Sequence, residues 1–307
     1  MARSERTGWA DRADSYRPRG RRRRRTPGYG RWMAENDANP PLSDEEKTAR
    51  SKSFGDVADL YERYRPGPPP EIVAWFLPEP TDCVVDLGAG TGALTRLLVE
   101  RARDVVAVEP DDRMRAVLAD RVPGARALAG RGEAIPVPDG SAQGVFASSS
   151  WHWMDPVPTL AEIHRVLAPG GVFGAVWTGP DPEGPFMQQA RALLEQMSEE
   201  SPDGADLAGS LTAGGAAGAA TADRLELPEG VPFGPLETET FTWDIALDAD
   251  ELIGLLGTLS WVILMPEDER SRIFATARRL LGEVLGIQGT TTVDVAYRAL
   301  GYRTFRD

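Results

Sequence analysis

Hydrophobic and polar positions alternate in two distinct ways between residues 83 and 177. Short apolar runs predict strands over residues 83–87, 105–108, 125–128, 144–148 and 172–177, and segments of helical period predict helices over residues 92–103, 111–120 and 157–167. Strands that alternate with amphipathic helices are typical of βαβ crossovers and of a parallel sheet covered on both faces. The fold class is therefore α/β, Rossmann-like and doubly wound. A ligand is expected outside the carboxyl ends of the strands.

The segments on either side of this core have different patterns. A polar helix is expected over residues 47–65 and ends at a proline-rich turn, and a short helix is expected over 71–76. The second half predicts helices over 185–197, 249–256 and 266–285 and strands over 238–247 and 291–302. These two strands are expected to pair at the sheet edge, with one of them antiparallel. Residues 198–223 are rich in Gly and Ala and are interpreted as a flexible insertion or lid.

The expected domain organisation follows from these segments. Residues 1–45 form a disordered basic N-terminal tail, and residues 46–307 form one domain. Within that domain, residues 46–80 are cap helices, residues 81–180 are the ligand-binding core, and residues 199–225 are the Gly/Ala-rich insertion.

Charge is distributed unevenly along the 307 residues, whose 34 basic and 47 acidic side chains give a net charge of −13. Residues 1–32 hold eleven arginines and three acids, a net of +8, so the remaining chain carries −21. An acidic body disfavours binding to nucleic acid or to an anionic membrane. The basic segment has three open interpretations: a nucleic-acid arm or basic anchor, a solvated disordered extension, or a segment upstream of a physiological start at Met33.

Other compositional features exclude further classes. The single cysteine, Cys83, rules out an internal disulfide framework and a Cys-based zinc site, and its place in an apolar strand favours a buried inert thiol. No stretch approaches 18 apolar residues, and no export signal is complete. We therefore expect a cytoplasmic protein that does not span a membrane.

The chemistry is concentrated in the segment VVDLGAGTG, residues 84–92. A strand that ends in a glycine turn before a helix lets a ligand approach the backbone closely. The spacing is G-x-G-x-G and not the G-x-G-x-x-G that serves a pyrophosphate. Asp86 lies two residues before the first glycine, where its charge suits a cationic ligand. Glu109 ends the next strand, where a carboxylate can accept both hydroxyls of a ribose, and Pro110 offers an apolar surface to a purine.

With these motifs, the run from Phe54 to Thr178 resembles the class I S-adenosylmethionine-dependent methyltransferases, in particular the small-molecule group with a D-x-G-x-G-x-G loop. The segments FGDVADLYERYRPGPP, VVDLGAGTG, VVAVEPDDRM, GEAIPVPDGS, WHWMD and EIHRVLAPGGVF occur in the order typical of that family. The resemblance implies a mostly parallel seven-stranded sheet with an antiparallel terminal strand. It also implies S-adenosylmethionine as cofactor, S-adenosylhomocysteine as product, and no metal.

The resemblance assigns roles to residues at the matching positions. The methionine part would be held by Asp86, Gly88, Ala89 and Gly90, the ribose by Glu109, and the adenine by Pro110 and Met114. The loop that borders the adenine would consist of Gly132, Glu133 and Ala134. Ser148 would face the cofactor amine, and Tyr61 and Arg65 would cover the cofactor. Many relatives have an Asp where Arg131 stands. Recognition of the adenine amino group would then fall to Glu133 or to backbone carbonyls.

The acceptor side is expected just after the fourth strand of the core. His152 is the candidate general base, although a histidine here would equally shape the pocket floor. His164, within a helix, is expected to be structural. Trp151, Trp153 and Trp177 are candidate acceptor contacts or ordinary core residues.

The expected activity is methyl transfer to a small, hydrophobic or aromatic acceptor. The segment SSSWHWMD replaces the N-P-P-Y type of motif, which disfavours adenine or glutamine N-methylation, and no metal-ligand spacing supports a magnesium-dependent catechol enzyme. Three alternatives remain: a nicotinamide-dependent oxidoreductase, a protein that uses the same fold for a cyclisation or for binding, and an RNA methyltransferase that depends on the arginine tail. The oligomeric state is open, a homodimer being one option.

Overall fold

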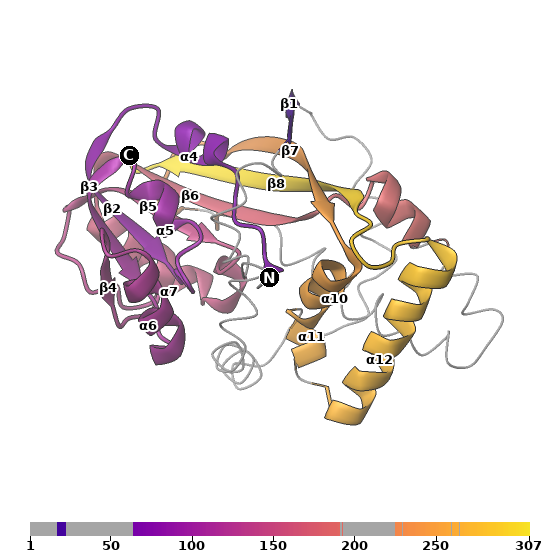
Figure 1. The fold of residues 1–307 in the computed structure, drawn as a ribbon. Helices are drawn as coiled ribbons and strands as arrows, with labels where there is room; N and C mark the ends of the chain where they lie inside the picture. The colour runs from indigo at the N-terminus through magenta and orange to yellow at the C-terminus, as the bar shows by residue number, and fades with distance from the viewer. Residues whose placement is uncertain are drawn as a thin grey trace.

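The computed structural model describes residues 17–22, 64–190, 192, 225–228, 230–258, 260–263 and 265–307. The expectations for Tyr61, for most of the tail and for nearly all of the Gly/Ala-rich insertion lie outside these residues. One mixed sheet forms the centre of the molecule, with the strand order β1-β7-β8-β6-β5-β2-β3-β4 (Figure 1). Its strands are β1 (Arg17–Arg22), β2 (Thr81–Leu87), β3 (Ala102–Val108), β4 (Arg126–Leu128), β5 (Ala142–Ser148), β6 (Leu167–Pro180), β7 (Glu237–Leu247) and β8 (Val293–Phe305).

The pairing confirms the predicted doubly wound sheet. Strands β2, β3, β4, β5 and β6 are parallel to one another, and β8 is antiparallel to both β6 and β7. The last two strands therefore join the sheet beside β6, and β8 is their antiparallel member, as expected. The order reverses at β2, which has β3 on one side and β5 on the other. Ligands bind at such a switch point.

Strand β1 was not expected from the sequence. Its residues Arg17–Arg22 lie in the segment predicted as a disordered tail, yet they pair antiparallel with β7, with Arg17 opposite Asp244 and Arg22 opposite Thr240. An exposed sheet edge offers unpaired backbone N–H and C=O groups to any extended segment, so this pairing needs no apolar pattern in the added strand. The prediction therefore does not hold for these six residues.

Three of the helices begin at side-chain caps that the sequence provides. The helices and helical turns are α4 (Pro70–Phe76), α5 (Thr95–Leu98), α6 (Asp112–Arg121), η4 (Trp151–Trp153), α7 (Pro156–Val166), α10 (Ala249–Gly257), α11 (Ser260–Ile263), α12 (Glu267–Arg279) and the π-helical turn η5 (Leu280–Val284). Asp111, Asp155 and Asp248 accept backbone hydrogen bonds at the starts of α6, α7 and α10. The predicted helix 92–103 is only the single turn α5.

Two apolar clusters cover the two faces of the sheet. On one face α7 packs Leu160 and Ile163 against β5 and β6, and on the other α4 packs Ile72 and Phe76 against the same sheet. Helices α10, α11 and α12 stand together beside the start of β8 (Figure 1). Within the described ranges, no helix is long and apolar enough to cross a membrane.

Candidate functional site

The glycine turn lies at the carboxyl end of β2. Gly88, Gly90 and Gly92 all have positive φ, at 63°, 57° and 93°. The N–H groups of Gly88 and Ala89 donate to the carbonyl of Val108 at 2.9 and 3.1 Å, which folds the turn toward the end of β3. Among the described residues, a Cβ built on Gly90 would meet no atom nearer than the Met114 sulfur at 4.0 Å, so this part of the chain leaves the backbone of Gly90 open to close approach.

Asp86 is a fully buried carboxylate just before this turn. Its Oδ2 accepts a hydrogen bond from the Thr95 hydroxyl at 2.6 Å, whereas its Oδ1 is buried and has no hydrogen-bond partner in the described part of the chain. Burial raises the pKa of Asp86 to about 7, against the lowering effect of the Thr95 hydrogen bond and with a further rise from Glu109. An unpaired buried carboxylate oxygen favours a hydrogen-bond donor that carries positive charge.

Glu109 directly follows β3 and is also buried. Its Oε2 accepts the N–H of Gly90 at 2.8 Å, and its Oε1 accepts the N–H of Asp111 at 2.9 Å. Burial raises its pKa, and the two backbone hydrogen bonds oppose that rise. The carboxylate therefore joins β3, the glycine turn and the start of α6 at one point. Pro110, beside it, is exposed, and Met114 is buried.

The loop after β4 is held close to α7. A Cβ on Gly132 would lie 2.7 Å from the Met154 sulfur and 2.9 Å from Thr159 Cγ2, so only glycine allows this approach. The Glu133 carboxylate accepts the N–H of Asp155, the residue that caps α7, at 2.9 Å. Ala134 is exposed. One oxygen of Glu133 is therefore already bonded to the backbone.

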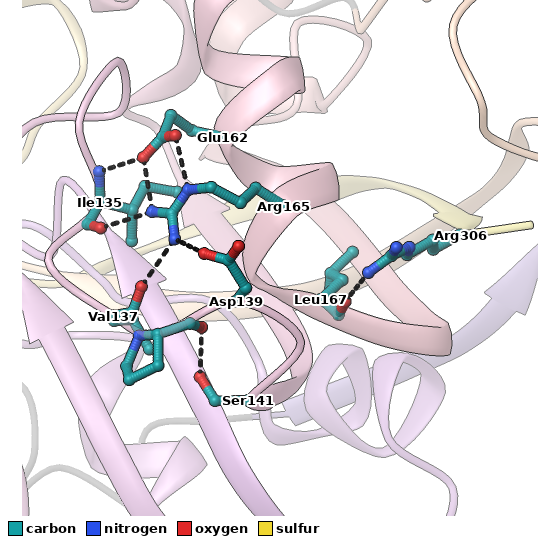
Figure 2. Close-up of polar contacts among 9 residues, drawn as sticks. Ile135, Val137, Asp139, Ser141, Glu162, Arg165, Leu167 and Arg306 are labelled. Atoms are coloured by element: carbon teal, nitrogen blue, oxygen red, sulfur yellow. Dashed lines mark hydrogen bonds and ion pairs between the residues drawn. The ribbon is translucent and has the colours of Figure 1, made fainter.

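Arg165, in the last turn of α7, clamps the same loop (Figure 2). Its guanidinium donates to the carbonyls of Ile135 at 2.9 Å and Val137 at 3.0 Å and to the carboxylate of Asp139 at 2.6 Å. It also pairs with both oxygens of Glu162 at 2.7 Å, and Glu162 accepts the N–H of Ile135 at 2.9 Å. The carboxylates of Glu162 and Asp139 raise the pKa of Arg165. Together with the two carbonyl contacts, they fix residues 135–139 to the helix.

The segment after β5 turns sharply at Ser149. It is the sole non-glycine residue with positive φ, at 49°, among the residues that the structure describes, and its N–H donates to Val176 at 2.8 Å. Such a conformation is strained and is often found at functional sites. Ser148, just before it, pairs with Val176 in the sheet. The hydroxyl of Ser150 donates to the carbonyl of Leu87 at 2.7 Å, which brings this turn against the glycine turn.

The aromatic candidates lie in two environments. Trp151 is buried in the core with its ring 5.3 Å from that of Phe173, and Trp177 is buried with its indole N–H donating to His152 Nδ1 at 3.4 Å. His152 and Trp153 are half-buried, and their ring centroids are 4.6 Å apart. His152 therefore lies between two tryptophans, at the end of the sheet where β5 and β6 stop.

Two other predicted residues lie away from the glycine turn. The Nε of Arg65 donates to the Thr258 hydroxyl at 3.3 Å, so this arginine reaches the end of α10. His164 packs its ring edge-on against Phe233 at 5.8 Å, and burial lowers its pKa. Thr95, Ser150 and Arg165 support the site but were not selected from the sequence, because each acts through a contact with a distant segment. In the described ranges, no group of three or more His, Cys, Asp or Glu residues could hold a metal ion.

The fold and the site define a class of protein. Three features are those of a class I methyltransferase. They are a doubly wound sheet with an antiparallel terminal strand, a glycine turn after its central strand, and an acidic residue after the neighbouring strand. A solved structure from Anaeromyxobacter dehalogenans, assigned to the type II methyltransferases, has the same fold, with a TM-score of 0.55 and 23% identity over 79% of this chain and 98% of that one.

Sequence comparison gives the family directly. Residues 85–175 match the family model described as "Methyltransferase domain". An uncharacterized methyltransferase of Mycobacterium tuberculosis is 37% identical over 231 residues, which cover 75% of this chain and 86% of that protein. An uncharacterized methyltransferase-like protein of Schizosaccharomyces pombe is 28% identical over 82% of this chain and 94% of its own. The chain therefore belongs to the methyltransferase family, and it is an S-adenosylmethionine-dependent enzyme of that family.

Proposed function

We propose that this enzyme transfers the methyl group of S-adenosylmethionine to a small acceptor with a hydrophobic or aromatic body. The observation that carries the proposal is the arrangement at one sheet edge of Asp86, the open backbone of Gly90, and Glu109. The aromatic residues beside His152 adjoin the same edge and supply an apolar wall for the acceptor.

The residues of this edge fit the cofactor. The Oδ1 of Asp86, which has no partner among the described residues, suits the α-ammonium group of the methionine part. The Glu109 carboxylate keeps lone pairs that can accept the ribose hydroxyls. Pro110 and Met114 would line the adenine, beside the loop of Gly132–Ala134. Ser148 keeps its proposed position at the amine. Arg65, which reaches the end of α10 through Thr258, is not proposed as a cover for the cofactor.

Positioning is the main catalytic task of such a site. The sulfonium of S-adenosylmethionine supplies an activated methyl carbon. The chain must hold the acceptor in line at near-attack distance, which is worth several kcal/mol, and must exclude water. The turn at Ser149 and Ser150, packed on Gly88, fixes the segment that carries His152 relative to the glycine turn.

His152 is the proposed proton acceptor for an acceptor that is protonated at working pH. Its Nδ1 already accepts the long hydrogen bond from Trp177, so the neutral ring carries its proton on Nε2. Proton uptake at Nδ1 would require this contact to break. We therefore expect His152→Ala to lower kcat about 100-fold with little change in cofactor affinity, and Trp177→Phe to shift the pH profile of kcat. Wild-type turnover in His152→Ala would leave His152 a scaffold residue.

Two measurements test the function. Calorimetry should detect binding of S-adenosylhomocysteine and not of NAD, and labelled methyl from S-adenosylmethionine should appear on members of a panel of small aromatic and aliphatic acceptors. Binding of NAD without binding of S-adenosylhomocysteine would support an oxidoreductase. Label that stays on the donor with every acceptor would support a non-transferase use of the fold. Removal of residues 1–32 should change neither activity nor RNA affinity.

A further inference from the structure

A glycine in the middle of α10 lies directly under the ring of a tyrosine from the segment before α4. A Cβ built on Gly254 would lie 2.5 Å from three ring atoms of Tyr64, namely Cδ1, Cε1 and Cζ. Glycine inside a helix is less favourable than alanine, and a close packing contact is the usual reason for its place there. The Tyr64 ring therefore lies against the backbone of α10, and a side chain at position 254 would displace it.

A second contact joins the same two elements. The Nε of Arg65 donates to the Thr258 hydroxyl at 3.3 Å, and Thr258 is the fully buried C-cap residue of α10. The described chain that leads into α4 accordingly starts beside α10 (Figure 1). Two consecutive residues thus hold the start of this segment against one helix.

The other end of the segment lies against the glycine turn. A Cβ on Gly67 would be in van der Waals contact with the Ala93 Cβ, at 3.4 Å. Ala93 directly follows Gly92, the last glycine of the turn that is proposed to serve the cofactor. Residues 64–67 therefore connect α10 to the cofactor side of the sheet.

The connection is short and stiff. Residues 64–67 span at most about 10 Å. Proline rings fix φ, and three prolines at or next to this segment are buried: Pro66, Pro68 and Pro69. Helix α4 follows, and its Ile72 and Phe76 are buried in the core of the α4 face. A displacement at Tyr64 therefore has little flexible chain to absorb it before it reaches Gly67.

We propose that Tyr64 is a positioning residue for the cofactor. Seated on Gly254, it sets the place of residues 64–67 against the glycine turn, so that cofactor affinity depends on α10. Its action runs through Gly67 and Ala93 and not through contact with the ligand. Coupling between two sites is reciprocal, so bound cofactor should in turn stabilise α10. This inference rests on the proposed binding of S-adenosylmethionine at the glycine turn.

Two glycine variants of α10 test the proposal. Gly254→Ala should lower the affinity for S-adenosylhomocysteine about tenfold in calorimetry, because the added methyl group displaces the Tyr64 ring. Gly257→Ala is the matched control in the same helix. A Cβ at Gly257 would meet only Phe274 among the described residues, at an ordinary 3.4 Å, so affinity should remain that of the wild type. Unchanged affinity in Gly254→Ala would overturn the proposal.

Removal of the ring shows whether Gly254→Ala acts through Tyr64. Tyr64→Leu should itself lower the affinity several-fold, and Gly254→Ala should cost little more in this background, because the smaller side chain leaves room for the methyl group. Additive losses in the double variant would place the effect in α10 itself and contradict the proposal. Tyr64→Leu introduces no clash, so it remains informative if Gly254→Ala does not fold. Wild-type affinity in Tyr64→Leu would also refute the positioning role.

Hydrogen exchange gives a readout that a purely structural contact would not change. Saturation with S-adenosylhomocysteine should slow amide exchange in residues 249–257 of the wild type, and Tyr64→Leu should lose this slowing. Exchange in α10 that is the same with and without bound ligand in the wild type would rule out the coupling. Absence of S-adenosylhomocysteine binding in the wild type would overturn the proposed cofactor and this inference with it. Binding that is equally tight in every variant would overturn this inference alone.

Discussion

The carboxylate of Glu109 accepts a hydrogen bond of 2.8 Å from the backbone N–H of Gly90. Its other oxygen accepts the N–H of Asp111, so one side chain fixes the glycine turn and the start of α6 while it faces the cofactor edge. In Glu109→Gln an amide NH₂ must face one of these two N–H groups, and the negative charge is lost. The affinity for S-adenosylhomocysteine should fall about 10- to 100-fold, which corresponds to about 1.4 to 3 kcal/mol.

Calorimetric titration of the variant against the wild type measures this change. Glu79→Gln is the control. It makes the same chemical change at an exposed residue beyond the end of α4, away from the site. Unchanged affinity in Glu109→Gln would show that the ribose lies elsewhere.

Asp86 should make cofactor affinity dependent on pH near neutrality. An ammonium group prefers the ionised carboxylate, and the pKa of Asp86 in the free protein is about 7. Affinity for S-adenosylhomocysteine should therefore rise with pH by up to about tenfold per unit below 7, and level off above it. In Asp86→Asn the amide oxygen still accepts the Thr95 hydrogen bond, but affinity should be weak and nearly independent of pH. A wild-type affinity that is flat between pH 5.5 and 8 would contradict this prediction.

The same shift gives the pH dependence of stability in the free protein. The folded pKa of Asp86 lies above the ordinary value of 3.8, so between these values the folded state binds more protons than the unfolded state. Stability should therefore fall as pH rises from about 4 to about 7. Asp86→Asn should flatten this slope, leaving the smaller contribution of Glu109, whose pKa is also raised. Urea unfolding at several pH values measures the slope of stability against pH. Asp82→Asn, at an exposed residue, is the control.

The sequence predicted the parallel core well because each buried strand is a continuous apolar run. It predicted a helix over 92–103 because the leucines there have helical spacing, but Gly92 has a φ of 93° and the chain enters β3 at Ala102, which leaves one helical turn. It missed β1, whose pairing uses backbone groups alone. Local periodicity contains no information about either effect.

In the candidate site too, some residues were predictable from the sequence and others were not. Asp86 and Glu109 were predictable because each occupies a fixed place relative to a strand end and the glycine turn. The contacts that support them, Ser150 to Leu87 and Arg165 to the loop after β4, join segments 63 and about 30 residues apart. The burial of the Tyr297 hydroxyl, which has no hydrogen-bond partner among the described residues, depends on strand register, and a single sequence does not reveal it.

Gly88 should tolerate no side chain, for a reason distinct from its backbone angle. A Cβ there would lie 2.6 Å from Ser150 Cβ. Gly140 has a similar φ of 61°, but a Cβ at Gly140 would meet no described atom within 4 Å. Both Gly→Ala variants carry the cost of positive φ, about 1 kcal/mol. Only Gly88→Ala must also displace the turn at Ser150, so it should lose several kcal/mol more and most of its affinity for S-adenosylhomocysteine. Denaturant unfolding of the pair measures the difference. Ser150→Gly in the Gly88→Ala background should recover part of the loss, and equal stability of the two single variants would refute the argument.

Arg165 should act on the cofactor through the loop that it clamps and not by contact with the ligand. Arg165→Lys keeps the charge but cannot reach Ile135, Val137 and Glu162 together, so the loop loses several hydrogen bonds and the free energy of unfolding should fall by about 2 kcal/mol. Because this loop is proposed to border the adenine, affinity for S-adenosylhomocysteine and for 5′-methylthioadenosine should fall by the same factor. Asp86→Asn should instead weaken only the binding of S-adenosylhomocysteine, since methylthioadenosine has no amino-acid part.

Arg126→Lys is the control and should leave both affinities unchanged, because it changes an exposed arginine that is paired with Asp104 on β3. Loss of stability in Arg165→Lys with both affinities intact would restrict the clamp to a structural role.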